Sequence, residues 1–249
     1  MKIKKILMVV ATAALTLGIM ASASAAGKFS VKADELQYDL ESGSGLAKGN
    51  VVAVQDNGRA TADYAEFNSK EKTAIFTGKV ILEKDGSQIV CDKLIMYSEN
   101  NFSAVGRAAV VKEGKRLEAD QIDYDKDAGY ATTVGGWAML TDVDGSTVAA
   151  QKIDYRMSEG LVQAHGGVQI KSPARNLEAS GDRAVYETKA NGFIELTGNA
   201  KAVQDGNSVE GDKLRLANNS LAKVTGNVEI IYLPQAQPQQ VKPQAEQLA

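Results

Sequence analysis

A two-part motif returns seven times along the 249-residue chain, at intervals of 28 to 31 residues. Its first part reads Ala-Asp-x-apolar-x-Tyr or a close variant, and its second position is held in turn by Asp34, Asp63, Asp92, Asp120, Gln151, Asp182 and Asp212. Its second part is centred on a glycine 14 to 16 residues further on, which is Gly49, Gly78, Gly106, Gly136, Gly166, Gly198 and Gly226. Seven concordant repeats predict a stack of similar units, because each unit can bury its apolar face only against its neighbours.

Each repeat is predicted to contain two β-strands. Around the glycines, apolar and polar residues alternate, as at Phe76, Gly78 and Val80, so one residue set including the glycine lies on the apolar face. Around the aspartates, apolar positions lie three residues apart, as at Ala119 and Ile122, and a bulge or corner near the aspartate would return both halves to one face. Because glycine weakens a strand interior, its recurrence at mid-strand indicates a bend at all seven glycines.

Bent strands that stack in this way predict an all-β fold of about seven two-strand repeats, in which two sheets meet along the line of the bends. Its interior is rich in Ala and Gly, and only 6% of the chain is aromatic. Small interior residues either leave an apolar trough or pack shut, and the sequence leaves both open. The predicted lining of a lipid trough is Phe76, Val80, Leu82, Leu94, Met96, Val110, Ile122, Tyr124, Ile153, Tyr155, Val168, Ile170 and Ile194.

The two ends of the chain differ from the repeats. Residues 1–26 combine three lysines, an uncharged stretch and a run of small residues, the pattern of a cleaved secretory signal peptide. We therefore expect an exported protein that is soluble after cleavage, with no retained membrane anchor. The repeat domain is predicted to span residues 27–233. Residues 234–249, rich in Gln and Pro, are predicted to form a disordered tail, with partner binding as the alternative.

Composition argues against several classes of protein. The chain has one Cys, one His, and 28 basic against 31 acidic residues, which excludes an intramolecular disulfide and a Cys-based zinc site and disfavours nucleic acid as the main partner. No phosphate-binding loop and no Ser/His/Asp constellation is visible, so we expect no enzyme, cofactor or metal site. The aspartates are too sparse for a calcium ladder and should cap the bends instead. We expect Cys91 to be buried and His165 to lie at the surface or in a turn. Trp137 has outward parity.

The motif resembles the OstA-like family over about residues 30 to 232. The resemblance rests on the Ala-Asp-x-apolar-x-Tyr segments, on Gly49-Asn50-Val51 and Gly226-Asn227-Val228, and on the opening Lys32-Ala33-Asp34-Glu35-Leu36-Gln37-Tyr38. It implies a V-shaped β-jellyroll ("β-taco") whose interior holds the acyl chains of lipid A. It also implies a lipopolysaccharide carrier in the periplasm that bridges the inner and outer membranes.

The same resemblance implies end-to-end stacking through edge strands. The partners would be an LptC-like inner-membrane protein, an LptD-like outer-membrane protein and further copies of the chain. The alternative is a structural or adhesive β-solenoid that binds glycan or protein on its outer face. Outward aromatic residues are scarce, which disfavours it.

Overall fold

The computed structural model describes residues 8–9, 29–56, 58–98, 100–156, 158–187, 193–217 and 221–232. The predicted signal peptide, apart from residues 8–9, and the predicted tail lie outside the described residues. In the described part, no helix is long and apolar enough to cross a membrane. The one helical element there is the short 3-10 helix η1 (Pro173–Arg175).

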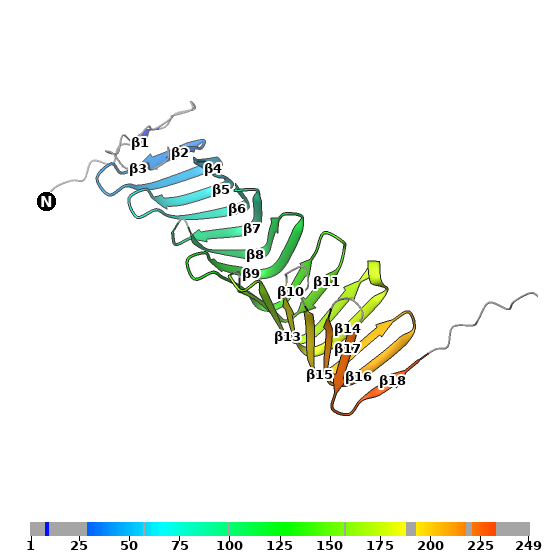
Figure 1. Ribbon diagram of the computed structural model, residues 1–249. Coiled ribbons are helices and arrows are strands. Elements are labelled where there is room, and N and C mark those ends of the chain that lie inside the picture. Colours follow the sequence, from blue (N-terminus) through cyan, green and yellow to red (C-terminus); the bar gives the residue numbers. More distant parts are fainter. Residues whose placement is uncertain are drawn as a thin grey trace, which may run out of the picture.

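The described residues form one antiparallel ladder of 18 strands, with β1, β2 and β3 at one end and β17 and β18 at the other (Figure 1). The strands are β1 (Met8–Val9), β2 (Phe29–Lys32), β3 (Glu35–Tyr38), β4 (Ser44–Gln55), β5 (Gly58–Asn68), β6 (Thr73–Lys84), β7 (Ser87–Met96), β8 (Asn101–Lys112), β9 (Lys115–Asp125), β10 (Tyr130–Thr141), β11 (Thr147–Ala150), β12 (Lys152–Arg156), β13 (Leu161–Ser172), β14 (Leu177–Glu187), β15 (Phe193–Gln204), β16 (Asn207–Ala217), β17 (Leu221–Thr225) and β18 (Glu229–Ile231).

Strands that carry the aspartates alternate with strands that carry the glycines. The former are β2 with β3, β5, β7, β9, β11 with β12, β14 and β16; the latter are β4, β6, β8, β10, β13, β15 and β17 with β18. Three of these units are split in two at the motif, and each half pairs with one half of the neighbouring long strand. The predicted fold class, an all-β structure of seven two-strand repeats, is confirmed.

The long strands change direction at the motif, and the register shows how. Thr61 and Tyr64 on β5 pair with Ile81 and Thr77 on β6, so a step of three residues faces a step of four. The additional residue therefore lies on the glycine strand, and the prediction of a bulge near the aspartate was wrong about which strand carries it. Gly78 and Lys79 absorb the additional residue with φ values of 84° and 49°.

On the outer side of the bend, the neighbouring strand leaves no room for a Cβ, so the position requires glycine. A Cβ placed on Gly106, whose φ is 79°, would lie 2.6 Å from Oδ2 and 2.9 Å from Cβ of Asp92. Asp92 is exposed, so the glycine faces the neighbouring aspartate and not the apolar face, where alternation had placed it. The residue after the glycine then binds the same carboxylate: Arg107 donates to Asp92 at 2.7 Å.

The same arrangement recurs in other repeats. Asn50 donates to Asp34 at 2.9 Å, and the Asp34 backbone N–H donates to the Gly49 carbonyl at 2.9 Å. Asn227 donates to Asp212 at 3.1 Å. The aspartates thus cap the bend, as their spacing predicted. We call this line of bends the crease.

The fourth and fifth repeats depart from the pattern. Val134 and Ala138 on β10 pair with Gln121 and Ala119 on β9, so a step of four residues on β10 faces a step of two on β9. The corresponding step on β8 is three residues, so the bulge of β10 is one residue longer. Gly135 faces Asp120 there, and nothing lies within 4 Å of a Cβ placed on Gly136, the glycine that the motif had selected. The next aspartate strand is broken at Gln151, between β11 and β12. The strands before and after this region run in clearly different directions (Figure 1).

The crease divides the sheet into two wings that enclose the apolar core. Wing A contains β2, β11 and β18, wing B contains β3, β12 and β17, and the long strands cross from one wing to the other. The largest fully buried side chains lie beside the crease, namely Leu94, Ile122, Ile153, Leu196, Leu214, Val51, Val80, Val168 and Thr133.

A glycine substitution tests the contact at the crease. Gly106→Ala should lower the free energy of unfolding by about 2 kcal/mol or more, because the new Cβ meets Asp92 in a left-handed backbone. Gly86→Ala is the matched control, since Gly86 has a φ of 72° and nothing within 4 Å. It should cost only about 1 kcal/mol. Equal losses in urea denaturation would show that the contact with Asp92 is unimportant.

Candidate functional site

The apolar interior between the wings has two layers. Beside the crease, the floor layer is closed: Val80, Leu94, Ile122, Ile153 and Val168 are at most 2% exposed. Phe76 and Ile170 are also buried. Towards the strand ends, the outer layer is only partly buried and consists of Leu82, Met96, Val110, Tyr124, Tyr155 and Ile194.

All thirteen residues predicted to line a trough therefore point between the wings, but the structure separates them by accessibility. In the outer layer Tyr124 stacks on Phe102 with ring centroids 4.9 Å apart. Tyr155 and Ile194 pack against the core from wing B, and Leu82 and Val110 do so from wing A. A ligand that enters between the strand ends meets these side chains before it can reach the floor.

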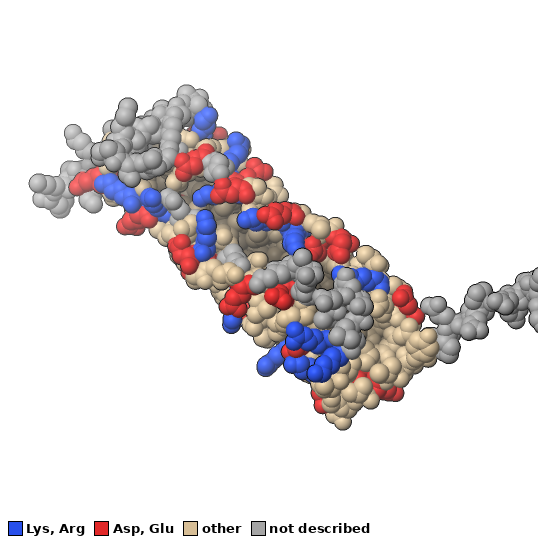
Figure 2. All heavy atoms as spheres, viewed as in Figure 1, with Lys and Arg blue, Asp and Glu red and all other residues tan. Residues whose placement is uncertain are grey.

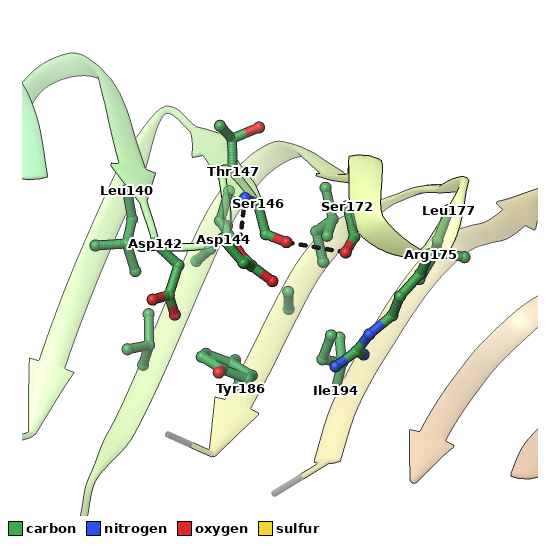
Figure 3. Close-up of a pocket in the computed structure, with 15 residues that line it drawn as sticks. Leu140, Asp142, Asp144, Ser146, Thr147, Ser172, Arg175, Leu177, Tyr186 and Ile194 are labelled. Atoms are coloured by element: carbon green, nitrogen blue, oxygen red, sulfur yellow. Dashed lines mark hydrogen bonds between the residues drawn. The ribbon is translucent and has the colours of Figure 1, made fainter. Parts of the chain in front are cut away.

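A cavity of about 110 Å³ opens between the wings in the second half of the ladder (Figure 3). Wing A contributes Leu140, Val148, Ile170 and Leu177 to its lining, and wing B contributes Val162, Tyr186 and Ile194. Ala164 and Ala184 lie beneath them. Its wall is thus mainly apolar, and two of the predicted lining residues belong to it.

Two turns of wing A form the polar rim of this cavity. Most wing A turns are tight, such as Asp85-Gly86, but the turn at residues 142–146 and the turn that contains η1 are longer. The Ser146 hydroxyl donates to the Ser172 oxygen at 2.9 Å and joins the two turns, while Lys115 pairs with Asp142 at 3.1 Å. The Arg175 side chain extends from its turn towards Ile194 on the opposite wing (Figure 3).

The rim is charged as well as polar. The backbone N–H and then the hydroxyl of Ser146 hold the pKa of Asp144 below its usual value, and the positive charge of Arg175 acts in the same direction. The carboxylate therefore stays ionised at neutral pH. The site combines an apolar interior with a rim of both charges, which suits an amphiphilic ligand.

Sequence reasoning did not select the rim residues. The sequence feature that could have pointed to the rim residues is the spacing of the motif. It lengthens to 31 residues between positions 120 and 151 and again between 151 and 182. Those two intervals contain the two longer turns and the additional residue of β10. Longer repeats therefore marked the place where the stack is interrupted.

A second polar cluster lies on the outer face of wing B, around Asp154. Its carboxylate accepts hydrogen bonds from Tyr130 at 2.6 Å and Thr132 at 2.5 Å, and Lys152 lies 3.1 Å away. Burial alone would raise the pKa of Asp154, but the hydrogen bonds from Thr132, Tyr130 and Lys152 outweigh it and lower the pKa.

His165 lies within β13, with its Nε2 3.7 Å from Asp154, so it is a surface residue on a strand and not in a turn. In the described part of the chain, no three His, Cys, Asp or Glu side chains are placed to hold a metal ion. Trp137 lies in the widened bulge of β10 and is 46% exposed.

Comparison with known proteins identifies the family of this chain. Residues 59–221 match the protein family described as "LptA/(LptD N-terminal domain) LPS transport protein", and the chain belongs to this family. The resemblance to OstA-like proteins is therefore confirmed. The family has a transport role, and the alternative of a structural or adhesive solenoid is not favoured.

Individual relatives are more distant. Two proteins named "LPS-assembly protein LptD", from Neisseria gonorrhoeae and Neisseria meningitidis, are 26% and 27% identical over 185 residues. The aligned region covers 69% of this chain but only 23% of each relative. The solved structure of LptH from Pseudomonas aeruginosa, titled as the LptA homologous periplasmic component of a lipopolysaccharide transport device, matches with 14% identity and a TM-score of 0.24. That match covers 71% of this chain and 95% of LptH.

The single thiol provides a test of the closed floor. Cys91 is 3% exposed, and burial raises its pKa from 9.0 to about 11. Native Cys91 should therefore resist iodoacetamide at pH 8 and react only after unfolding. Between pH 9.0 and about 11 the unfolded chain loses this proton and the native chain keeps it, so stability should fall as pH rises.

Cys91→Ala is the control, because other groups also titrate in this range. The difference between the wild-type and Cys91→Ala unfolding free energies should decrease across the same pH window. Rapid alkylation of the native thiol at pH 8 would contradict a closed floor.

Proposed function

We propose that this protein carries lipopolysaccharide across the periplasm and shields the acyl chains of lipid A between its two wings. The observation that carries the proposal is the graded interior of a member of a lipopolysaccharide-transport family: a closed apolar floor beneath a partly exposed apolar layer. Each buried methylene is worth about 0.8 kcal/mol, so an unshielded acyl chain crosses water slowly. A continuous apolar interior removes that barrier without any catalytic chemistry.

Filling the cavity between the wings with an acyl chain requires the wings to separate there. The cavity of about 110 Å³ is smaller than the roughly 150 Å³ cavity that holds one benzene molecule, and an acyl chain is larger still. We propose that acyl chains enter through the outer layer at Met96, Tyr155 and Ile194, while the crease acts as the hinge. The floor residues Leu94, Ile122 and Ile153 then form the base against which the chains pack.

The two ends of the ladder supply the proposed contacts with other transport proteins. Among the described residues, β17 and β18 pair only with β16, so their outer edges are free. Ile230 and Tyr232 beside this edge are 69% and 68% exposed. Free strand edges are templates for β-augmentation, here by an LptD-like or LptC-like domain or by a second copy of this chain.

At the other end of the ladder, exposure of a strand edge depends on cleavage of the predicted signal peptide. There β2 pairs only with β4 in the described part, whereas β3 also pairs with β1. Because β1 lies within the predicted signal peptide, cleavage after residue 26 would expose the edge of β3. We propose that export to the periplasm both delivers the repeat domain, residues 27–233, and frees this edge, with residues 234–249 as its tail.

Photo-crosslinking in a double-membraned bacterium tests the proposal. A photoreactive residue at Tyr155 or Ile194 should form lipopolysaccharide adducts, because these side chains line the outer layer of wing B. Probes at Lys79 and Asp123, on the outer surface, should form few. Protease resistance of each exported variant controls for folding. Adducts of equal yield at all four positions, or at none in folded protein, would refute a lipid-binding interior.

A further inference from the structure

The outer face of wing B carries a row of cations in the second half of the ladder. Cross-strand pairing places the side chains of one row in the order Lys152, His165, Arg183, Thr197, Lys213 and Thr225. The parallel row beside it is Asp154, Gln163, Val185, Glu195, Arg215 and Lys223. We call these two rows the cationic face, and Figure 2 shows Lys and Arg gathered over β13 to β17.

The two acids in the cationic face lie beneath the cations that they bind. Lys152 is 49% exposed and its partner Asp154 only 11%. Lys213 and Arg215 are 48% and 47% exposed, and both pair with Glu195, which is 18% exposed. In some other pairs the acid is as accessible as the cation, as in the pair of Lys171 and Glu178 at 63% and 70%. The charge presented to solvent is therefore mainly positive.

Two cations of this face are not neutralised at all. Arg183 and Lys223 are exposed and have no ion-pair partner among the described residues. Arg215 also lies over the ring of Phe193, with the guanidinium carbon 3.9 Å from the centroid, which fixes its side chain at the surface. The positive charge collects on this face although the whole chain has a net charge of −3.

The cationic face is separate from the lipid-binding interior. Its first row is beside the crease, since Lys152 follows Gln151 and Arg183 follows Asp182, and its side chains point away from the core. A lipid held between the wings cannot reach it. Lys152, Arg183 and Lys213 lie on β12, β14 and β16, and neighbouring strands are about 4.8 Å apart, so these cations form one spaced row across the sheet.

We propose that the cationic face docks on a membrane surface that contains anionic phospholipid. A row of exposed Lys and Arg on one outer face complements the phosphates of an anionic leaflet, and each such cation adds to the attraction. Partial burial of Phe193 and Val185 among the cations gives the face an apolar component that tolerates contact with headgroups. The docked protein would present the outer face of wing B to the membrane, keep the aspartates of the crease away from the contact, and leave the mouth between the wings accessible.

The test is flotation of the purified full-length protein with vesicles. Wild-type protein should bind phosphatidylcholine vesicles that contain phosphatidylglycerol and should not bind phosphatidylcholine alone. Binding should occur at about 0.15 M salt, and raising the salt to about 1 M, which shortens the Debye length from about 8 Å to about 3 Å, should release the protein. The double variant Arg183→Gln and Lys223→Gln should lower the partition coefficient by about tenfold or more.

The matched control removes two exposed lysines from the first half of the same outer face, Lys48→Gln with Lys93→Gln. This control should bind like wild type. Equal loss in both double variants, equal binding to both kinds of vesicle, or no release by salt would overturn the proposal. Absence of binding by wild-type protein would also overturn it and direct attention to an acidic protein as the occupant.

This inference goes beyond lipid carriage, and the two can fail separately. The Arg183→Gln and Lys223→Gln variant should keep the lipopolysaccharide crosslinks at Tyr155 and Ile194. Loss of those crosslinks in wild-type protein, with vesicle binding intact, would refute the carrier function and leave the cationic face as a membrane-docking surface.

Discussion

The contact between a glycine and the aspartate of the preceding strand is the constraint on which this structure depends. At this contact two consecutive residues, such as Gly106 and Arg107, take left-handed conformations, and the strand turns out of the plane of the sheet. Because the contact recurs at the same point of each repeat, the bends line up as the crease. A single such bend would only kink a hairpin, whereas seven in register fold one sheet into two facing wings.

The crease also sets the gradient of burial between the wings. Side chains beside it, such as Leu94 and Ile153, face the opposite wing at short range and are closed off. Side chains near the strand ends, such as Met96 and Tyr155, lie where the wings are further apart. In each long strand the residues beside the crease stabilise the fold, and the residues near the strand end are accessible to a ligand. An opening of the outer layer therefore need not disrupt the floor that holds the wings together.

The middle of the ladder combines several departures from the repeat. The additional residue of β10, the break at Gln151 and the two longer turns of wing A occur in consecutive units. The cavity lies among these units, and the strand direction changes near them (Figure 1). An interrupted repeat packs less completely than a regular one, which accounts for the cavity at this place.

The sequence alone determined the all-β class, the number of repeats and which of the larger apolar side chains point inward, because period-two alternation and a 30-residue period are local properties. It did not determine that the additional residue lies on the glycine strand or that Gly135 and not Gly136 meets Asp120, since both depend on pairing between strands. The cavity rim and the cationic face were decided only by tertiary structure. Lys152 and Lys213 are 61 positions apart in the sequence, and only the register of four successive strand pairs places them in one row.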